Sequence, residues 1–414
     1  MPKSPMRSAA LLGPALVAGV AYLDPGNVAS NMTAGARYGY LLVWVVVAGN
    51  VMAWLVQYLS AKLGVVTGRS LPEILGARIR SRWARRAYWL QAELVAMATD
   101  IAEVLGGAVA LNLLFGTPLL LGGAITGGVS IALLAVQTRR GPRHFEFVII
   151  GLMAIIVVGF VAGLFVAPPD AGGVLGGMLP RFTDSGSVLL AASILGATVM
   201  PHAIYAHSAL TRDRFGAPTD SATQRERVPS IRTLLTVTRW DVSIAMVIAG
   251  SVNLAILLLA AANLAGVEGT DSLEGAHAAI TASLGPFIGT LFAVGLLASG
   301  LASTSVGAYA GAEIMHGLLT IRIPLLARRL FTLIPALLIL GVGFDPTAAL
   351  VLSQVVLSFG IPFALIPLVA LTAQRRTLGE HANRTVTTLL GVLFAALLIA
   401  LNVALLWLVL TNAG

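Results

Sequence analysis

The sequence contains no cysteine, and charged residues make up only 11% of its 414 positions. Without cysteine the chain has no disulfides, no thiolate nucleophile and no cysteine-ligated zinc or iron-sulfur centre. A water-soluble domain carries about 25% charged residues, so this chain has too few to cover a surface that faces water. Because 57% of the residues are hydrophobic, the composition predicts a polytopic membrane protein and excludes most soluble enzymes.

Eleven apolar runs approach the roughly 20 residues with which a helix crosses the hydrocarbon core. They start near Leu11, Leu41, Trp89, Leu119, Phe145, Val188, Ile244, Pro286, Leu326, Ala348 and Val386. The runs are continuous, unlike the alternating segments of an outer-membrane barrel, so we expect an all-α protein with eleven transmembrane helices. The longest connection, from Thr211 to Arg239, is polar and is expected to be a flexible loop. No connection has room for a soluble domain, so residues 1–414 are predicted to form one transmembrane domain.

The formal net charge of +8 is explained by membrane topology and not by nucleic-acid binding. In the eleven-helix arrangement, all of the 26 Lys and Arg residues except Arg37 and Arg181 fall on the side of the N-terminus. Short loops rich in Lys and Arg stay in the cytoplasm. We therefore expect a cytoplasmic N-terminus and, because the number of helices is odd, an extracytoplasmic C-terminus. The expected surroundings are the lipid bilayer, with no nucleic-acid partner.

A proline-glycine pair interrupts the first apolar run, in the stretch Ala21-Tyr22-Leu23-Asp24-Pro25-Gly26-Asn27. A break here frees backbone carbonyls near Ala21, and Asp24 and Asn27 can turn oxygen atoms toward the same point. The alternative interpretation is that Asp24 is only the N-cap of a second half-helix that begins at Pro25. Both can hold together, because a capping carboxylate at membrane depth still has to be desolvated.

A second proline interrupts the sixth run, in Gly196-Ala197-Thr198-Val199-Met200-Pro201-His202, and frees carbonyls near Ala197. The first and sixth runs cross the membrane in opposite directions, and paired broken helices in corresponding places are typical of inverted-repeat transporters with a midplane site. Taken alone, Met200 is most simply a packing residue. Beside a broken turn and opposite Asp24 and Asn27, its thioether suits Mn²⁺, Fe²⁺ or Cd²⁺ better than Ca²⁺ or Mg²⁺.

The stretches Asp24-Pro25-Gly26-Asn27 and Met200-Pro201-His202 resemble the two signature motifs of the Nramp family of divalent-metal transporters. The resemblance continues from Gln91 to Asp100 and through Leu352-Ser353-Gln354, covers essentially all eleven runs, and points to the bacterial proton-coupled manganese transporters of that family. It implies a five-plus-five inverted-repeat fold with helices 1 and 6 unwound at the midplane. The implied parts are residues 11–167 for the first repeat, 188–372 for the second and 386–411 for a peripheral helix.

The resemblance also implies a metal site and a function. Its ligands would be the side chains of Asp24, Asn27 and Met200, the carbonyls of Ala21 and Ala197, and Gln354 in some conformations. The protein would not be an enzyme but would import Mn²⁺ and Fe²⁺, and also Cd²⁺ and Co²⁺, with protons by alternating access across the bacterial cytoplasmic (inner) membrane. Metal and protons would be substrates, no cofactor would be needed, and a monomer would suffice. Relatives that handle magnesium or aluminium differ at the methionine, so Met200 indicates a transition metal.

Three carboxylates of the third run, Glu93, Asp100 and Glu103, are separated by seven and three residues and therefore lie near one face of a helix. Carboxylates inside a bundle suit the relay of protons. The family resemblance assigns Asp100 and Glu103 to such a path, with Arg328 and Arg329 as charge partners. For Glu93, an interfacial position beside the nearby arginine cluster is an equally good interpretation.

Two histidines follow the second break. His202 lies two residues after Met200, points away from it on a helical turn, and is favoured for proton handling over packing. His207 is left open between these two roles. Asp241 and Glu313 lie near the ends of runs, where structural pairing is expected.

Proteins of other classes would use this architecture differently. A sodium- or proton-coupled amino-acid symporter presents glycine-rich backbone to the substrate carboxylate, which Asp24 would repel. An intramembrane metalloenzyme needs a closed ligand set such as His-Glu-x-x-His, and His202 and His207 provide neither the glutamate nor the spacing. A passive channel is distinguished from a transporter only by flux kinetics.

Overall fold

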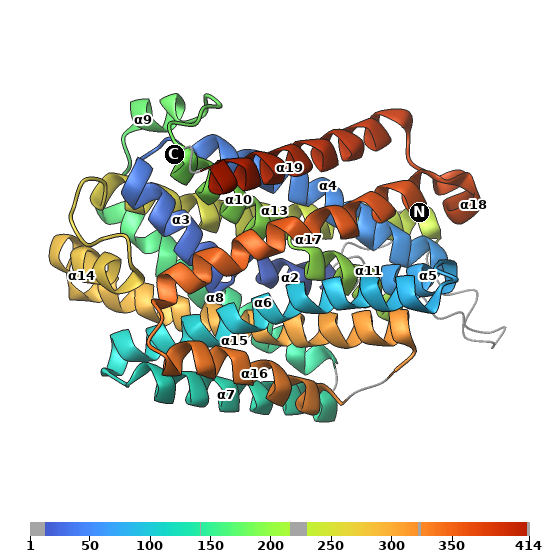
Figure 1. The fold of residues 1–414 in the computed structure, drawn as a ribbon, viewed down its shortest axis with the longest axis horizontal. Coiled ribbons are helices and arrows are strands. Elements are labelled where there is room, and N and C mark those ends of the chain that lie inside the picture. The colour runs from blue at the N-terminus through green and yellow to red at the C-terminus, as the bar shows by residue number, and fades with distance from the viewer. Residues whose placement is uncertain (1–12, 141, 216–229, 322–323, 412–414) are drawn as a thin grey trace, which may run out of the picture.

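The computed structural model describes residues 13–140, 142–215, 230–321 and 324–411, and these residues are almost entirely helical, without a β-strand (Figure 1). In this part of the chain eight stretches of helix are long and apolar enough to cross a membrane. They are α4 (Val43–Thr67), α6 (Arg82–Phe115), α8 (Pro142–Val166), α10 with α11 (Ser185–Phe215), α13 (Ile231–Asn263), α15 (Pro286–Leu319), α17 (Pro346–Ala373) and α19 (Thr385–Thr411). The predicted all-α, multi-pass class is confirmed.

The other predicted runs correspond to shorter helices. The first run forms α2 (Pro14–Val20), the 3₁₀ turn η1 (Ala21–Leu23) and α3 (Pro25–Tyr38). The fourth and ninth form α7 (Leu119–Arg140) and α16 (Leu325–Gly341). Within the described residues each of the eleven predicted runs therefore coincides with helix, and the start of the first run, Leu11 and Leu12, lies outside them. The number of membrane crossings stays a prediction.

Several helices are longer than the apolar runs that predicted them. α6 already begins at Arg82, and α13 begins at Ile231. The predicted loop from Thr211 to Arg239 is wrong at both ends, because α11 (Pro201–Phe215) and α13 extend into it, and its middle lies outside the described residues. Hydrophobicity marks only the part of a helix that enters hydrocarbon, whereas caps mark its true start. The hydroxyls of Ser81 and Ser230 accept hydrogen bonds from backbone N–H groups in the first turns of α6 and α13.

Short helices fill the connections. They are α5 (Leu71–Arg78), α9 (Ala171–Gly176), α14 (Leu273–Leu284), α18 (Arg375–Leu378) and the 3₁₀ turn η2 (Gly379–His381). α5 starts with a reciprocal capping box between Ser70 and Glu73. It then packs against α15, where the carbonyl of Gly317 lies too close to Gly76 for any side chain.

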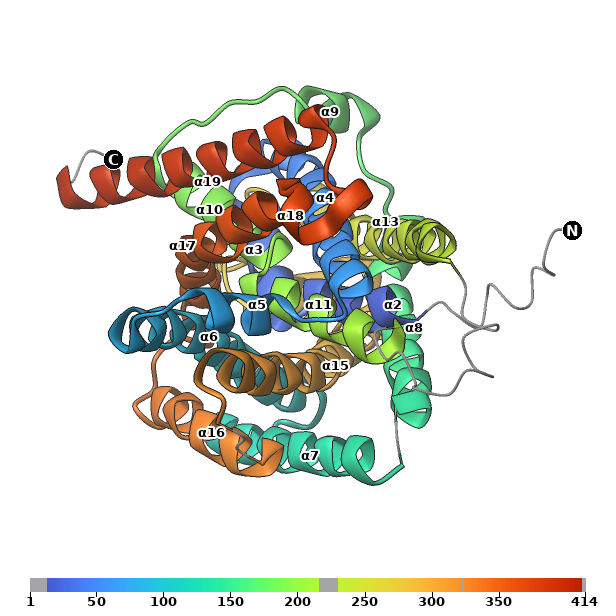
Figure 2. The same cartoon turned by 90° about the vertical axis from the view of Figure 1, so that its right-hand side faces the viewer.

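The broken helices lie at the centre of the bundle. In the most apolar part of α10 and α11, 89% of the residues are buried, against 33% for α8 and 28% for α19. In both views α7 and α16 lie together along one side of the molecule, while α19 lies along the opposite side (Figures 1 and 2). Helix α3 contacts α13, α10 and α17, so its N-terminal end is held inside a ring of other helices.

Candidate metal site between two broken helices

The first break is centred on Asp24. Its backbone is extended (φ −70°, ψ 162°) between η1 and α3, and Pro25 occupies the first turn of α3. One carboxylate oxygen of Asp24 accepts a hydrogen bond from the Asn27 backbone N–H at 2.8 Å, and the other accepts one from Gln354 Nε2 at 3.2 Å. Asp24 is fully buried. It is therefore an N-cap, as the simpler interpretation proposed, but only one of its oxygens serves the cap.

The second break lies between α10, which ends at Thr198, and α11, which begins at Pro201. Val199 and the fully buried Met200 form the non-helical turn. Asn27 Nδ2 donates hydrogen bonds to the carbonyl oxygens of Tyr22 (2.9 Å) and Ala197 (2.8 Å). One side chain therefore joins the two breaks.

Gln354 of α17 is held against both breaks by two close approaches. A Cβ at Gly26 would lie 1.7 Å from Gln354 Nε2, and one at Gly196 would lie 2.0 Å from the Gln354 carbonyl oxygen. Gly196 therefore requires glycine, because its neighbour is a backbone carbonyl, whereas a side chain at position 26 would displace the Gln354 carboxamide from the first break. All six predicted metal-site residues are buried at the two breaks or against them: Ala21, Asp24, Asn27, Ala197, Met200 and Gln354.

Two residues that the sequence analysis did not identify also contact the first break. Asn253 of α13 donates a hydrogen bond from Nδ2 to the Tyr22 carbonyl at 2.9 Å. The hydroxyl of Ser299 on α15 donates to the Leu23 carbonyl. Backbone groups freed inside a membrane protein must find such partners, because no lipid group can satisfy them. For Asn253, the signal available in the sequence is a carboxamide in the middle of an apolar run.

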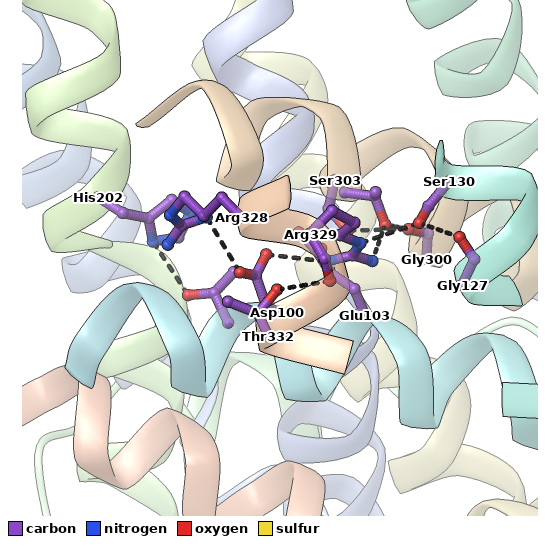
Figure 3. A network of polar contacts seen from close by, with 12 residues as sticks. Asp100, Glu103, Gly127, Ser130, His202, Gly300, Ser303, Arg328, Arg329 and Thr332 are labelled. Atoms are coloured by element: carbon purple, nitrogen blue, oxygen red, sulfur yellow. Dashed lines mark hydrogen bonds and ion pairs between the residues drawn. The ribbon is translucent and has the colours of Figure 1, made fainter. Parts of the chain in front are cut away.

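A cluster of charged side chains lies beside the site, between α6, α15 and α16 (Figure 3). Arg329 donates to Asp100 at 2.9 Å and to Glu103 at 3.2 Å. Arg328 donates to Asp100 at 3.1 Å and to Glu93 at 2.9 Å. Glu93 therefore belongs to this cluster and not to an interfacial group with the arginines at the start of α6.

The cluster is almost completely enclosed. Arg329, Asp100 and Glu103 have no exposed surface, and Arg329 is also held by the hydroxyls of Ser130 (2.9 Å) and Thr304 (3.2 Å). Three carboxylates face two guanidinium groups, so the ionised cluster would carry one surplus negative charge. Two of its oxygens, Glu93 Oε2 and Glu103 Oε1, have no hydrogen-bond partner among the described residues.

The two histidines lie in different networks. His202 adjoins the charged cluster, and its Nδ1 is 3.2 Å from the Thr99 hydroxyl (Figure 3). His207 Nδ1 is 2.6 Å from Gln57 Oε1, and Gln57 Nε2 donates to the Tyr22 hydroxyl. The described structure therefore connects His207 to the first break through Gln57 and not to the carboxylates of α6.

One end of the bundle has a cavity lined in part by α3, α10 and α17, the helices that carry the two breaks and Gln354. It has a volume of about 430 Å³, and Thr33, Arg37, Asp271 and Val351 are among its lining residues. Below it the Ser30 and Ser193 hydroxyls are 2.6 Å apart, and Ser193 also donates to the Val351 carbonyl at 3.1 Å. Ser30, Ser193 and Val351 each lie one helical turn from a metal-site residue of the same helix. They form a thin polar layer that separates the cavity from the two breaks.

A helix cap at Asp184 stabilises the rim of the cavity. Asp184 caps α10 through the Ser187 backbone N–H and accepts a hydrogen bond from the Tyr38 hydroxyl at 2.7 Å. The hydrogen bond from Tyr38, with that from the Ser187 backbone, holds the pKa of the Asp184 carboxyl below its usual value. These hydrogen bonds favour the ionised form of the cap.

At the opposite end of the bundle more layers of side chains separate the two breaks from the surface. Beyond Gln57 and His207, Arg212 of α11 pairs with Glu73 of α5 at 2.9 Å and with Glu313 of α15 at 3.0 Å. Glu313 thus has the structural pairing expected for it. Three helices are joined at this end by one guanidinium group, so the site is closed from both ends, with the thinner barrier under the cavity.

These features define a multi-pass membrane transporter built around two broken helices, and comparisons with known proteins give its family. The family model described as natural resistance-associated macrophage protein-like (Nramp) matches residues 15–408. The divalent metal cation transporter MntH of Mycobacterium tuberculosis is 61% identical over 402 residues, which are 97% of this chain and 92% of that protein. The chain belongs to the Nramp family, as its motifs predicted, and this is a family of transporters and not of enzymes.

Solved structures agree with this assignment. A crystal structure of the manganese transporter of Eremococcus coleocola matches with a TM-score of 0.83 and 31% sequence identity, over 97% of this chain and 87% of that one. MhsT in complex with L-phenylalanine matches with a TM-score of 0.59 and 16% identity, over 96% and 97% of the two chains. At that identity the second match shows a common fold only.

Proposed function

We propose that this protein imports divalent transition-metal ions, chiefly Mn²⁺ or Fe²⁺ and also Cd²⁺ and Co²⁺, together with protons. The observation that carries the proposal is Asp24, a fully buried carboxylate held between two broken helices together with a carboxamide, a thioether and freed carbonyls. Relatives described as a divalent metal cation transporter and a manganese transporter support the choice of substrate. The metal is the cargo and not a resident cofactor.

The ligand chemistry favours soft or borderline ions. Among the described residues, no three His, Asp or Glu side chains are grouped so as to hold a metal. The ion would therefore bind one carboxylate and several neutral groups, and the Met200 thioether would discriminate against Ca²⁺ and Mg²⁺. Binding at the Ala197 carbonyl would replace its hydrogen bond with Asn27, which would free the Asn27 side chain to turn its oxygen to the ion.

The amino-acid symporter is the less favourable alternative. Its substrate would bring a carboxylate to the first break, where Asp24 already places a buried negative charge. The resemblance to MhsT concerns the fold and carries no information on substrate. Asp24 therefore separates the two functions.

Transport would occur by alternating access. The breaks are closed from both ends, by the serine layer under the cavity on one side and by the Gln57 and Arg212 contacts on the other. A rearrangement that opens one barrier at a time would pass the ion without a continuous pore. At an inside-negative potential of about 100 mV, a dication gains about 4.6 kcal/mol on entry, which corresponds to about a thousandfold accumulation.

Proton coupling is supported by the charges of the neighbouring cluster. With three carboxylates against two arginines, one proton would neutralise the surplus charge, and Glu93 and Glu103 each have an oxygen free to accept it. His202 lies between this cluster and the second break. We infer that Asp100, Glu103, Glu93, His202, Arg328 and Arg329 form the proton pathway, with His207 as a separate branch through Gln57.

We further propose the bacterial cytoplasmic membrane as the location, with the N-terminus in the cytoplasm and the C-terminus outside. The cavity with Arg37 and Asp271 then opens outward, and the Arg212 ion pairs face the cytoplasm. Residues 11–167 and 188–372 would be the inverted repeats and 386–411 the peripheral helix. The slight burial of α19 supports the last assignment, and a monomer contains every residue that the mechanism uses.

The direct test is Mn²⁺ uptake into proteoliposomes that contain a metal-quenched dye and a pH dye. The wild type is expected to show saturable uptake with internal acidification, in the presence of excess Mg²⁺ or Ca²⁺. Met200→Ala is expected to keep transport and to lose selectivity against Ca²⁺, because the remaining oxygen ligands suit hard ions. Uptake of an amino acid without Mn²⁺ uptake would favour the symporter, and uptake that never saturates would indicate a channel.

A separate prediction concerns the movement of α2. The Asp241 carboxylate on α13 accepts hydrogen bonds from the Gly13 N–H at 3.2 and 3.3 Å and from the Ala15 N–H at 2.9 Å. This interhelical cap joins the start of α2 to α13, and we infer that the contact is lost when the bundle opens toward the cytoplasm. Its loss in Asp241→Ala is expected to favour the inward-open form by about 2 kcal/mol, roughly thirtyfold in population.

The absence of cysteine makes this measurable, because a single introduced thiol is labelled uniquely. Ala18→Cys places the thiol on the buried surface of α2, and a membrane-impermeant thiol reagent added from the cytoplasmic side is expected to react faster in the Asp241→Ala background. Asp170→Ala is the matched control, because Asp170 caps the exposed helix α9. Equal labelling in all three backgrounds would contradict a role of Asp241 in holding α2.

A further inference from the structure

A groove between α4 and α13 lies apart from the metal site and is not used by the proposed transport mechanism. It has a volume of about 470 Å³ and is lined by aromatic, hydroxyl and basic side chains. These include Trp54, Tyr58, Thr236, Arg239, Trp240 and Ser243. The two helices are in contact, and α13 lies at the edge of the bundle (Figure 2).

The groove lies at the depth where hydrocarbon meets lipid headgroups. The uncharged run from Ile244 to Asn263 has the roughly 20 residues that a helix needs to cross the hydrocarbon core. Arg239 and Trp240 lie just over one helical turn before it, with Asp241 in between. Tryptophan and tyrosine are enriched at this level, because their rings are apolar while their N–H and O–H groups remain hydrated. The residues of the groove are therefore typical of a membrane interface.

The groove also continues onto surfaces that face lipid. On α13, Trp240, Ile244 and Val247 follow one another on one face and are 65%, 42% and 64% exposed. On α4, Val51 is 56% exposed one turn before Trp54. Apolar side chains of this size exposed on a membrane-spanning helix provide a surface for acyl chains.

The basic side chain in the groove is held in place by its neighbours. Trp54 Nε1 donates to the Ser243 hydroxyl at 2.9 Å, and the Trp54 ring stacks on Tyr58 with centroids 6.2 Å apart. The Arg239 guanidinium lies 5.9 Å from the centroid of the Trp54 ring. Among the described residues no carboxylate lies within ion-pair distance of Arg239, which is exposed. The groove therefore presents a positive charge that no described carboxylate pairs with.

We propose that this groove binds the phosphodiester headgroup of an anionic phospholipid. Arg239 would bind the phosphate oxygens with its planar guanidinium, and the Tyr58 hydroxyl would donate to the headgroup. The acyl chains would follow the exposed faces of α4 and α13. Basic pockets between membrane helices on the cytoplasmic side bind lipids of this kind. The leaflet follows from the proposed orientation, but the binding itself does not depend on the transport function.

The test is native mass spectrometry of the full-length protein titrated with phosphatidylglycerol or phosphatidylcholine. We expect the wild type to bind one phosphatidylglycerol more tightly than phosphatidylcholine, and Arg239→Gln to bind it about fivefold more weakly. The matched control is Arg232→Gln, which removes the same charge two turns earlier on α13, from an arginine that is 81% exposed and 3.6 Å from Glu380. This control is expected to bind phosphatidylglycerol like the wild type.

Three outcomes would overturn the proposal: equal binding by the wild type and Arg239→Gln, an equal loss in both arginine variants, or displacement of the lipid by soluble glycerol phosphate. The second would indicate a general charge effect and the third a site for free phosphate. Both arginines are exposed, so the variants are expected to fold, and equal thermal unfolding midpoints in lipid-free detergent check this. The Asp24→Ala variant is expected to keep the lipid, so a failure of the transport proposal would be recognised separately.

Discussion

Asp24→Ala is expected to abolish Mn²⁺ uptake in proteoliposomes. Asp24 is the one charged ligand among the predicted metal-site residues, and it has no exposed surface. A carboxylate and a dication about 4 Å apart attract by about 8 kcal/mol at an effective dielectric constant of 20, twice the value for unit charges. Even if half of this is offset by dehydration, the lost affinity is about a thousandfold. Uptake in the micromolar range of Mn²⁺ should then fall to the background of empty liposomes.

Asp24 also caps α3, so a second variant must separate charge from fold. Asn and Asp are comparable N-caps, so Asp24→Asn keeps the hydrogen bond with the Asn27 N–H while it removes the charge. It should keep the wild-type unfolding midpoint and still lose uptake. If Asp24→Asn transports Mn²⁺ at the wild-type rate, the carboxylate is not a metal ligand and the site must lie elsewhere.

The two breaks could be predicted from the sequence because proline acts locally. Pro25 and Pro201 remove backbone donors from their own helices wherever these helices pack. The partners of the freed carbonyls could not be predicted in this way. Asn253 and Ser299 reach Tyr22 and Leu23 from helices far along the chain, and only the packing of α13 and α15 brings them there.

The charged cluster shows the same limit. The spacing of Glu93, Asp100 and Glu103 places them near one face of α6 whatever surrounds that helix. Their exact pairing with Arg328 and Arg329 follows from the position of α16 beside α6 and α15, which no local pattern specifies. Helix ends were also mispredicted, since the start of α13 depends on the Ser230 cap and not on hydrophobicity.

The second large effect is expected for Arg329→Leu. Arg329 is fully buried and is the group that faces both Asp100 and Glu103, so its removal leaves two adjacent carboxylates with fewer counter-charges and no solvent. Breaking a buried ion pair from one side costs about 3–5 kcal/mol. We expect a clearly lower thermal unfolding midpoint in detergent and, where protein can be purified, loss of the internal acidification that accompanies metal uptake.

Two further variants make the interpretation specific. Arg232→Leu removes an arginine whose pair with Glu380 is exposed, and an exposed pair contributes about 0–1 kcal/mol, so its midpoint should stay near that of the wild type. Arg329→Leu combined with Glu103→Gln removes a charge of each sign and should recover part of the lost stability, because one fewer carboxylate is left without a counter-charge. If the double variant is no more stable than Arg329→Leu alone, the lost stability arises from packing around the guanidinium and not from the carboxylates. The charge balance of this cluster would then not be what couples protons to metal.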